Sequence, residues 1–463
     1  MCSYTLEEIG KHKTETDCWV ILYGNVYDIT DFMSVHSGKK FPLQVAGGDG
    51  TALFESIHPR RAKAILNSQE FKDKYLLGSV SVGVDALQRD LDIAHTVDAS
   101  PRGPRDLDIA HTVAESSKLA GSKCSKFDSL FASDINSAVD EYFRNAKPRD
   151  SRGGWNEKRN VYGKFALIIS LTVGARYKSL KTRKYKYSVM YAICMLAVIF
   201  NISHGANHGE LVKRYPAAFS KLCQYSHHLL GASHIDWMHW HNVSHHQHTN
   251  SRLDVDSTRN YPYAPNYRYH QNEELRWYTR YQHYYTWMLY LGTYFVAFGE
   301  ESINTFKLHC LVLNALSFLA TRRLYFKHIF VESVVFGFLF VMINCVTHAT
   351  HLAEWTEEIT DDWYKHQVES SANWSTKSRV VVQLLGGINY QIEHHLFQSV
   401  HHSHYPAMSK IVRRVCADHG VRYVSNDSYF KGLYSHYKCL RQNSKTIVSY
   451  NDTLQPNAVL KSC

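Results

Sequence analysis

Histidines in three short groups are the residues of this chain best suited to metal chemistry. Residues four apart on a helix lie on one face, so paired imidazoles can converge on one point, whereas adjacent residues diverge by ~100° and can address different metals. Imidazole binds iron, zinc, copper and nickel, so residue type alone does not select the metal. The groups are HGANH (His204, His208), HNVSHH (His241, His245, His246) and QIEHH (Gln391, His394, His395).

A single HxxxH pair is weak evidence for a metal, because a helix surface or a hydrogen-bonded interior explains it equally well. Three such groups near apolar segments, among 29 histidines in 463 residues, favour a two-metal site instead. The seven imidazoles of these groups, shared by two metals, would leave coordination positions open for oxygen.

A further candidate pair lies in INCVTHATH, where Asn344 and His348 are four apart near the end of an apolar run. A histidine there is ordinarily an interfacial residue, and an asparagine ordinarily bonds a neighbouring helix. The three groups need a ligand from the membrane side to complete the coordination. We therefore predict His348 as a ligand and Asn344 as a weaker candidate.

Two histidines near the N-terminus suggest a separate cofactor. His36 follows VYDITDFMSV, and His58 ends AGGDGTALFESIH. Two imidazoles on opposite faces of a haem fill both axial positions, and such an iron transfers electrons without binding oxygen. On the two histidines alone, two surface residues near turns are the simpler interpretation.

Apolar segments must position these groups. A helix needs ~20 apolar residues to cross a bilayer, and residues 187–209, 281–299 and 333–353 qualify, whereas 165–175 and 308–321 are short. Groups two and three can share metals only if an even number of crossings separates them, so we predict 281–299 and 333–353 as that pair. The first eighty residues instead indicate a small α+β domain, with WVILYGNVYDIT alternating like a strand.

Composition sets wider limits. The net charge of +10 suits an anionic membrane or nucleic acid equally, and ten cysteines without a CxxC pair argue against a zinc site or a disulfide scaffold. The N-terminus has no signal peptide, so we expect it to stay in the cytosol. RDLDIAHTV occurs at 89–97 and again at 105–113, which we interpret as a duplicated linker.

The N-terminal segment resembles the cytochrome b5 family in CWVILYGNVYDITDF, AGGDGT, FESIHP and YLLGSV. The resemblance covers residues 1–82 and implies haem b with His36 and His58 as axial ligands. Three departures concern the loop: the family's HPGG reads HSGK, the interval to His58 is one residue shorter, and Pro42 interrupts an expected helix.

Most of residues 150–430 resemble the cytochrome b5-fusion front-end fatty acyl desaturases, through HGANH, HNVSHHQHTN, RWYTRYQHYY and YQIEHHLFQSVHHSHYP. That family has glutamine at the position of Gln391. Gly205 and Ala206 depart from it, since an Asp often follows the leading histidine, and His401 and His402 match a motif that we interpret as supporting. The resemblance implies two non-haem irons, with Asn344 acting through water and these ligands: His204, His208, His241, His245, His246, His348, His394 and His395.

The resemblance also implies the architecture. A small α+β haem domain (1–82) would be followed by a linker (83–150), an all-α multi-pass membrane desaturase domain (151–440) with about four transmembrane helices and cytosolic His-box helices, and a polar tail (441–463). We expect the endoplasmic reticulum membrane, with haem and boxes facing the cytosol. Basic residues between 176 and 186 conflict with this orientation, because the positive-inside rule would place them in the cytosol.

The implied reaction is insertion of a cis double bond into a polyunsaturated acyl chain, carried by CoA or phospholipid, with O2. Electrons would come from NADH-cytochrome b5 reductase, since the chain lacks a Gly-rich dinucleotide fingerprint; nucleic acid is not an expected partner. Position Δ5 is favoured over Δ4, Δ6 and Δ8. The alternatives are a sphingolipid desaturase, a lipid hydroxylase, and a haem carrier whose metal site has decayed.

Overall fold

The computed structural model describes residues 2–36, 38, 41–58, 60–81, 127–145, 155–211, 215–251, 253–254, 267–268, 270, 275–295, 303–356, 359 and 362–445. The duplicated segments 89–97 and 105–113, most of the predicted linker and the end of the predicted tail lie outside these residues.

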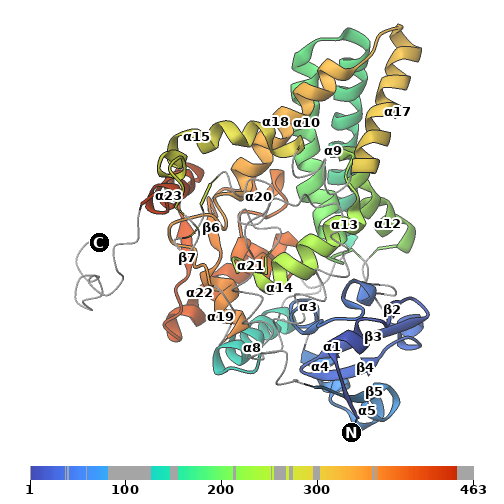
Figure 1. Ribbon diagram of the computed structural model, residues 1–463, viewed down its shortest axis with the longest axis vertical. Coiled ribbons are helices and arrows are strands. Elements are labelled where there is room, and N and C mark those ends of the chain that lie inside the picture. The colour runs from blue at the N-terminus through green and yellow to red at the C-terminus, as the bar shows by residue number, and fades with distance from the viewer. Residues whose placement is uncertain are drawn as a thin grey trace.

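A five-stranded sheet forms the N-terminal part, in the order β1-β5-β4-β3-β2 (Figure 1). The predicted strand is an antiparallel hairpin of β3 and β4, joined by Tyr23 and Gly24. Both joining residues have positive φ, 52° and 75°, as a tight two-residue hairpin requires. The strands are β1 (Cys2–Tyr4), β2 (Lys13–Thr14), β3 (Asp17–Leu22), β4 (Asn25–Asp28) and β5 (Leu76–Val80).

Short helices complete this α+β domain. The 3₁₀ segment η1 replaces the expected helix at Pro42, whose missing N–H is tolerated there. The sheet and the helices share a core that includes Val20, Tyr27 and Leu53. The helices are α1 (Leu6–Ile9), α2 (Phe32–Val35), η1 (Phe41–Val45), α3 (Thr51–Ile57), α4 (Arg60–Leu66) and α5 (Gln69–Tyr75).

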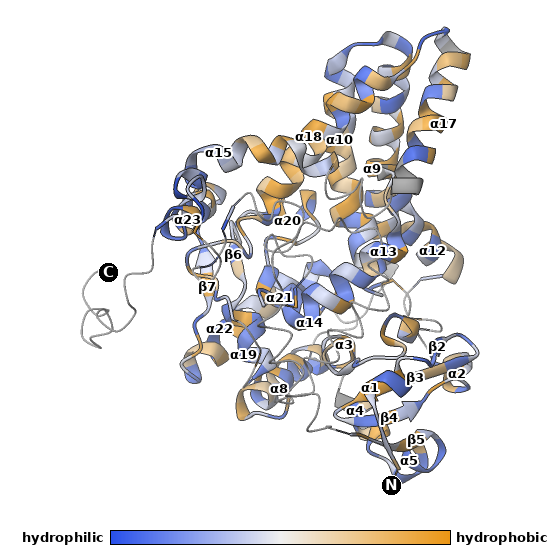
Figure 2. Cartoon of the chain, in the orientation of Figure 1, coloured by the Kyte–Doolittle hydropathy of each residue, from blue (hydrophilic) through white to orange (hydrophobic). Residues whose placement is uncertain are grey.

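Four long helices pack side by side at the opposite end of the molecule (Figure 1). By length and composition, Tyr185–Asn207 and Phe326–Asn344 could cross a membrane. Figure 2 shows these helices to be rich in apolar residues. The four are α9 (Trp155–Thr182), α10 (Tyr185–Val198), α17 (Ile303–Thr321) and α18 (Phe326–Asn344).

The predicted span at 281–299 is not one of the two candidate spans among the described residues. Its described part, 281–295, contains α15 (Gln282–Leu289) and the 3₁₀ turn η6 (Tyr290–Gly292). The Tyr290 hydroxyl lies 2.8 Å from His436 Nε2, a polar partner that a bilayer would not supply to this segment. The helix that precedes α18 is α17, which contains the short run 308–321.

Both helical hairpins turn at the end distant from the histidine groups. Arg183, in the turn between α9 and α10, donates to the carbonyl of Leu324 at 3.0 Å and to Thr321 Oγ1 at 2.7 Å. These bonds tie it to the turn between α17 and α18. Arg176 pairs with Glu332 across α9 and α18, with Nη1 and Oε2 at 2.6 Å. Two of the basic residues that conflict with the predicted orientation are therefore bound within the bundle.

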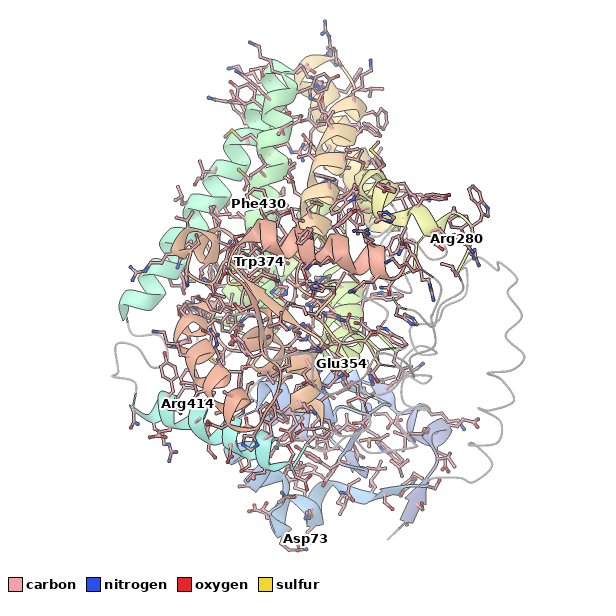
Figure 3. All side chains as sticks on the ribbon, turned by 90° about the vertical axis from the view of Figure 1, so that its left-hand side faces the viewer. Asp73, Arg280, Glu354, Trp374, Arg414 and Phe430 are labelled. Atoms are coloured by element: carbon pink, nitrogen blue, oxygen red, sulfur yellow. The ribbon has the colours of Figure 1, made fainter. Side chains whose placement is uncertain are left out.

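A layer of shorter helices lies between the bundle and the N-terminal domain (Figure 1). It contains one parallel strand pair, β6 (Ala372–Trp374) with β7 (Val424–Asn426), so this part is mostly helical and the all-α prediction is wrong in this detail. In Figure 3, α23, with Phe430 labelled, crosses the foot of the bundle. The main helices are α8 (Leu130–Asn145), α12 (Ala217–Tyr225), α13 (His234–Met238), α19 (Trp363–Glu369), α20 (Arg379–Leu384), α22 (Tyr405–Asp418) and α23 (Tyr429–Gln442).

Candidate metal centre

The first two histidine groups lie at π-helical segments. Helix α10 continues through the π-helix η2 (Ile199–Ser203) into α11 (His204–Asn207), and the second group lies in η4 (His239–His245) and α14 (His246–His248). The third group lies in α21 (Gln391–Leu396). π-Helical turns inside α-helices occur frequently at functional sites.

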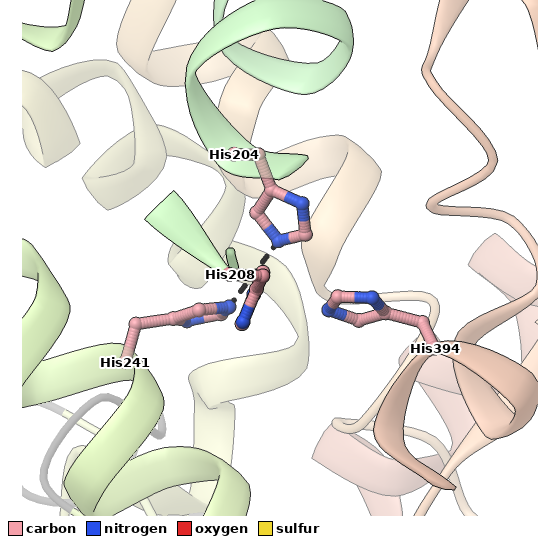
Figure 4. A group of neighbouring side chains, drawn as sticks. All are labelled: His204, His208, His241 and His394. Carbon is pink, nitrogen blue, oxygen red and sulfur yellow. Dashed lines mark hydrogen bonds between the residues drawn. The ribbon is translucent and has the colours of Figure 1, made fainter. Parts of the chain in front are cut away.

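Four imidazoles from these segments form one group. His204, His208, His241 and His394 each offer a ring nitrogen, and these atoms lie within 4.8 Å of one another. Figure 4 shows the four rings directed toward a common point, with His204 Nε2 and His241 Nε2 at 3.3 Å. All four side chains are buried.

A second group consists of His245, His348 and His395, whose ring nitrogens also lie within 4.8 Å of one another. The Gln391 amide nitrogen is 2.9 Å from His348 Nε2 and 3.0 Å from His395 Nε2. His348, which the sequence predicts as a metal ligand from the membrane side, therefore lies beside the third histidine group.

His246 lies between the groups. Its Nε2 is 3.1 Å from His241 Nε2, and its ring stacks on His395 with ring centroids 4.2 Å apart. His241 and His245, although four apart, enter different groups. The segment η4 is a π-helix, and its i to i+5 repeat brings His241 toward His246. The adjacent residues His394 and His395 do enter different groups.

Oxygen atoms hold four of the imidazoles at Nδ1. His208 bonds Gln398 Oε1 at 3.0 Å, His245 bonds Asp254 Oδ2 at 3.0 Å, His348 bonds the Ser370 carbonyl at 3.1 Å, and His395 bonds Gln367 Oε1 at 2.9 Å. An acceptor at Nδ1 fixes the proton there and places the lone pair, which can bind a metal, on Nε2; this is the usual arrangement around metal-bound histidine. Sequence reasoning missed these partners, because three come from distant segments and none has a distinctive spacing.

The donor set fits a metal. Burial, and then the neighbouring imidazoles, hold the pKa of the following histidines well below the usual value of 6.5: His208, His241, His246, His348, His394 and His395. Neutral imidazole is the form that binds metals. His208 Nε2 and His394 Nε2 are also buried without a hydrogen-bond partner, as is Gln391 Oε1, and a metal would supply the missing interactions.

Asn344 is less directly placed. Its amide donates to the Phe340 carbonyl at 2.8 Å, one turn back in α18, and its described contacts include none of the imidazoles. His401, His402 and Glu210 form a separate cluster of possible metal ligands, distinct from both imidazole groups. A Cβ at Gly205 would collide with the Glu210 carboxylate, so Glu210 occupies the space that the glycine leaves.

The N-terminal domain contains a cavity of ≈ 340 Å³ lined mainly by apolar side chains. His36 and His58 both line this cavity, with ring centroids 5.8 Å apart. His58 Nδ1 lies 3.1 Å from the Phe54 carbonyl. A Cβ at Gly38 would lie 2.9 Å from the His36 ring, so this glycine permits the close turn beside it. The pair and the apolar walls fit a haem held from both faces.

Comparisons with known proteins agree with both sites. Residues 186–426, more than half of the chain, match the family model of fatty acid desaturases. The chain belongs to this family. Residues 5–81 of the desaturase match the cytochrome b5-like heme/steroid binding domain. It is therefore an oxygen-dependent oxidoreductase whose cofactors are haem and a di-iron centre.

Three curated relatives of the desaturase each share 26% identity with it. The acyl-lipid (8-3)-desaturase of Physcomitrium patens matches over 95% of this chain and 91% of its own length. The Delta(5) fatty acid desaturase A of Dictyostelium discoideum matches over 94% and 93%. The sn-1 linoleoyl-lipid 6-desaturase of Arthrospira platensis matches over 68% and 92%.

Proposed function

We propose that this desaturase is a front-end enzyme, which inserts a cis double bond between the carboxyl end of a polyunsaturated acyl chain and its first existing double bond. The observation that carries the proposal is the pair of buried imidazole groups at the foot of apolar helices. The names of the full-length relatives, a Delta(5) and an (8-3) enzyme, favour position Δ5.

The proposed ligands follow from the two groups. One iron would be held by His204, His208, His241 and His394, and the other by His245, His348 and His395, with His246 between them. Gln391 would tune the second iron, because its amide lies between His348 and His395, and Asn344 would act only through water. His36 and His58 would hold the haem.

The di-iron centre, when bound, supplies an oxidant strong enough to remove hydrogen from an unactivated methylene. The protein must place one carbon pair beside it and keep water out. Phe200 in η2 and Phe340 in α18 stack with ring centroids 5.7 Å apart, in a core that also contains Met195 and Phe336. We propose that the acyl chain enters along α18 and along the helix that continues from α10 through η2 to His204.

We propose a haem domain at 1–82, a linker at 83–150 whose helix α8 packs on the desaturase helices α19 and α22, a desaturase domain at 151–440 and a tail at 441–463. Four crossings by α9, α10, α17 and α18 would leave every histidine group on one side of the membrane. Exposed apolar residues on these helices support contact with lipid: Leu167, Leu171, Ile193, Leu311, Leu319 and Phe330. The proposed location is the endoplasmic reticulum, with NADH-cytochrome b5 reductase as the electron donor in the cytosol.

Expression in yeast tests this function. Cells are fed separate polyunsaturated acids that differ in chain length and in the position of the first double bond, and new double bonds are mapped by mass spectrometry. We expect a product lighter by two hydrogens, with the new bond on the carboxyl side. A product heavier by one oxygen would indicate a hydroxylase, and modification of sphingolipid alone would indicate a sphingolipid desaturase.

A further inference from the structure

The haem domain contacts the segments that carry the metal centre. Helix α3, whose C-cap residue is His58, receives two hydrogen bonds from consecutive residues that follow the third histidine group, Gln391 to His395. Gln398 Nε2 donates to Ser56 Oγ at 2.9 Å, and Ser399 Oγ donates to the Ile57 carbonyl at 3.2 Å. A third bond joins Tyr364 to Glu55 Oε2 at 2.7 Å. The last turn of α3 is therefore fixed against the desaturase domain.

Gln398 differs from Ser399 and Tyr364 because its side chain also bonds a histidine of the metal centre. Its Oε1 lies 3.0 Å from Nδ1 of His208, a member of the first imidazole group. Gln398, Ser56 and His208 are 2%, 4% and 0% exposed, so water does not compete for these bonds. If His208 binds a metal through Nε2, its Nδ1 carries the proton, so the amide must present oxygen to His208 and nitrogen to Ser56.

The bonds form one continuous path between the two redox sites. From His208 the path runs through the Gln398 side chain to Ser56 Oγ, and from Ser56 it follows two peptide units to His58. The His58 backbone N–H and its Nδ1 both lie close to the Phe54 carbonyl, at 2.9 and 3.1 Å, so the end of this path is held within α3.

We infer that Gln398 is a positioning residue that aligns and electronically couples the haem domain to the di-iron centre. This inference rests on the ligand roles proposed above. For each electron, ferrous haem becomes ferric and one iron of the centre is reduced by one electron. Two electrons, supplied by NADH through a flavin reductase, join two protons, O2 and two substrate hydrogens to give two waters and one double bond. No proton needs to cross the Gln398 path.

The test measures haem reoxidation in membranes of yeast fed an acid that the enzyme desaturates. A limited pulse of NADH reduces the haem through the host reductase, and the return of the ferric Soret band is then followed, with the His58→Ala variant subtracted as background. Gln398→Leu keeps the side-chain volume and removes both bonds. We expect reoxidation about 10-fold slower, with the haem midpoint potential and haem spectrum unchanged.

Ser399→Ala and Tyr364→Phe are matched controls, because each removes a bond between the domains that does not lead to an imidazole of the metal centre. Both should reoxidise like the wild type. Gln398→Glu should recover much of the rate, since a carboxylate can accept from His208 and also from the Ser56 hydroxyl once that hydroxyl turns from the Leu53 carbonyl, to which it donates at 3.1 Å. Equal slowing in Gln398→Leu and in the controls would mean that Gln398 only docks the domains, and would overturn the inference.

Ser56→Ala addresses the case in which Gln398→Leu loses iron. Ser56 lies in the haem domain, so iron per haem should stay at the wild-type ratio while reoxidation slows. Adding Ser56→Ala to Gln398→Leu should slow it no further, because both changes interrupt one path. Wild-type reoxidation in Ser56→Ala would refute the coupling. If haem reoxidation in the wild-type enzyme is no faster than in His395→Ala, the result would overturn the proposed function as well as this inference.

Discussion

The two histidine sites of this desaturase are built differently. In the haem domain, His36 and His58 face each other across a cavity of ≈ 340 Å³, and the surrounding core is apolar. In the metal centre, the imidazoles contact one another, and four are each held at Nδ1 by an oxygen atom. The first site is a space that a large planar group fills, whereas the second is a network in which each ligand is held by several segments.

The largest difference should follow from removing one ligand of the network. His395→Ala should lose iron as well as turnover, because the imidazole binds directly and its loss also frees Gln391 and Gln367. The expected fall in turnover exceeds the ~10 to 100-fold typical of a supporting residue. Iron per haem and product yield are measured together. Gln391→Ala is the control, which should keep most of its iron while turnover falls; full activity there would make Gln391 merely structural.

The haem site should respond more locally. His58→Ala should abolish the haem Soret band while non-haem iron stays bound, because the domain keeps its own sheet and core. Turnover driven by the attached domain should be lost. A free cytochrome b5 should restore part of it, since fusion mainly supplies effective concentration. Retained haem with an unchanged bis-imidazole spectrum would contradict the ligand assignment, and concurrent loss of iron would contradict the separation of the sites.

The same difference explains what could be predicted from the sequence. Local rules of spacing and hydropathy predict the three histidine groups and the spans 187–209 and 333–353, and these spans overlap the candidate spans Tyr185–Asn207 and Phe326–Asn344. The supporting residues do not follow from such rules, because Gln398 meets His208 across 190 positions. The π-helix η4 was also missed, since its i to i+5 repeat depends on packing around His241.

Hydropathy also predicts a span at 281–299 that is not among the candidate spans of the described residues. Residues 281–299 contain no Asp, Glu, Lys or Arg before Glu300, so they score as a span. Their Tyr, Trp and His side chains have polar tips, and Trp287 and Tyr290 bond His283 and His436 instead of facing lipid. Two of the basic residues that conflict with the expected orientation, Arg176 and Arg183, are bound to Glu332 and to the turn after α17.

The smallest predicted effect concerns Asp254, whose carboxylate oxygen holds one imidazole of the metal centre. Asp254 accepts from His245 Nδ1 at 3.0 Å and from the Asn250 backbone N–H at 2.8 Å, and it is 0% exposed. Asp254→Asn can preserve both bonds through its oxygen but removes the negative charge that raises the basicity of the imidazole. We expect turnover about 10-fold lower, at the mild end of such changes, with the haem spectrum unchanged.

Asp134→Asn is the matched control for Asp254→Asn. Asp134 on α8 pairs with His419, which follows α22, at 2.8 Å, away from both imidazole groups. It should keep wild-type turnover and iron. An equal effect in the two variants would show that a buried charge beside His245 has no special role, and that the oxygen contacts only hold the ring in place.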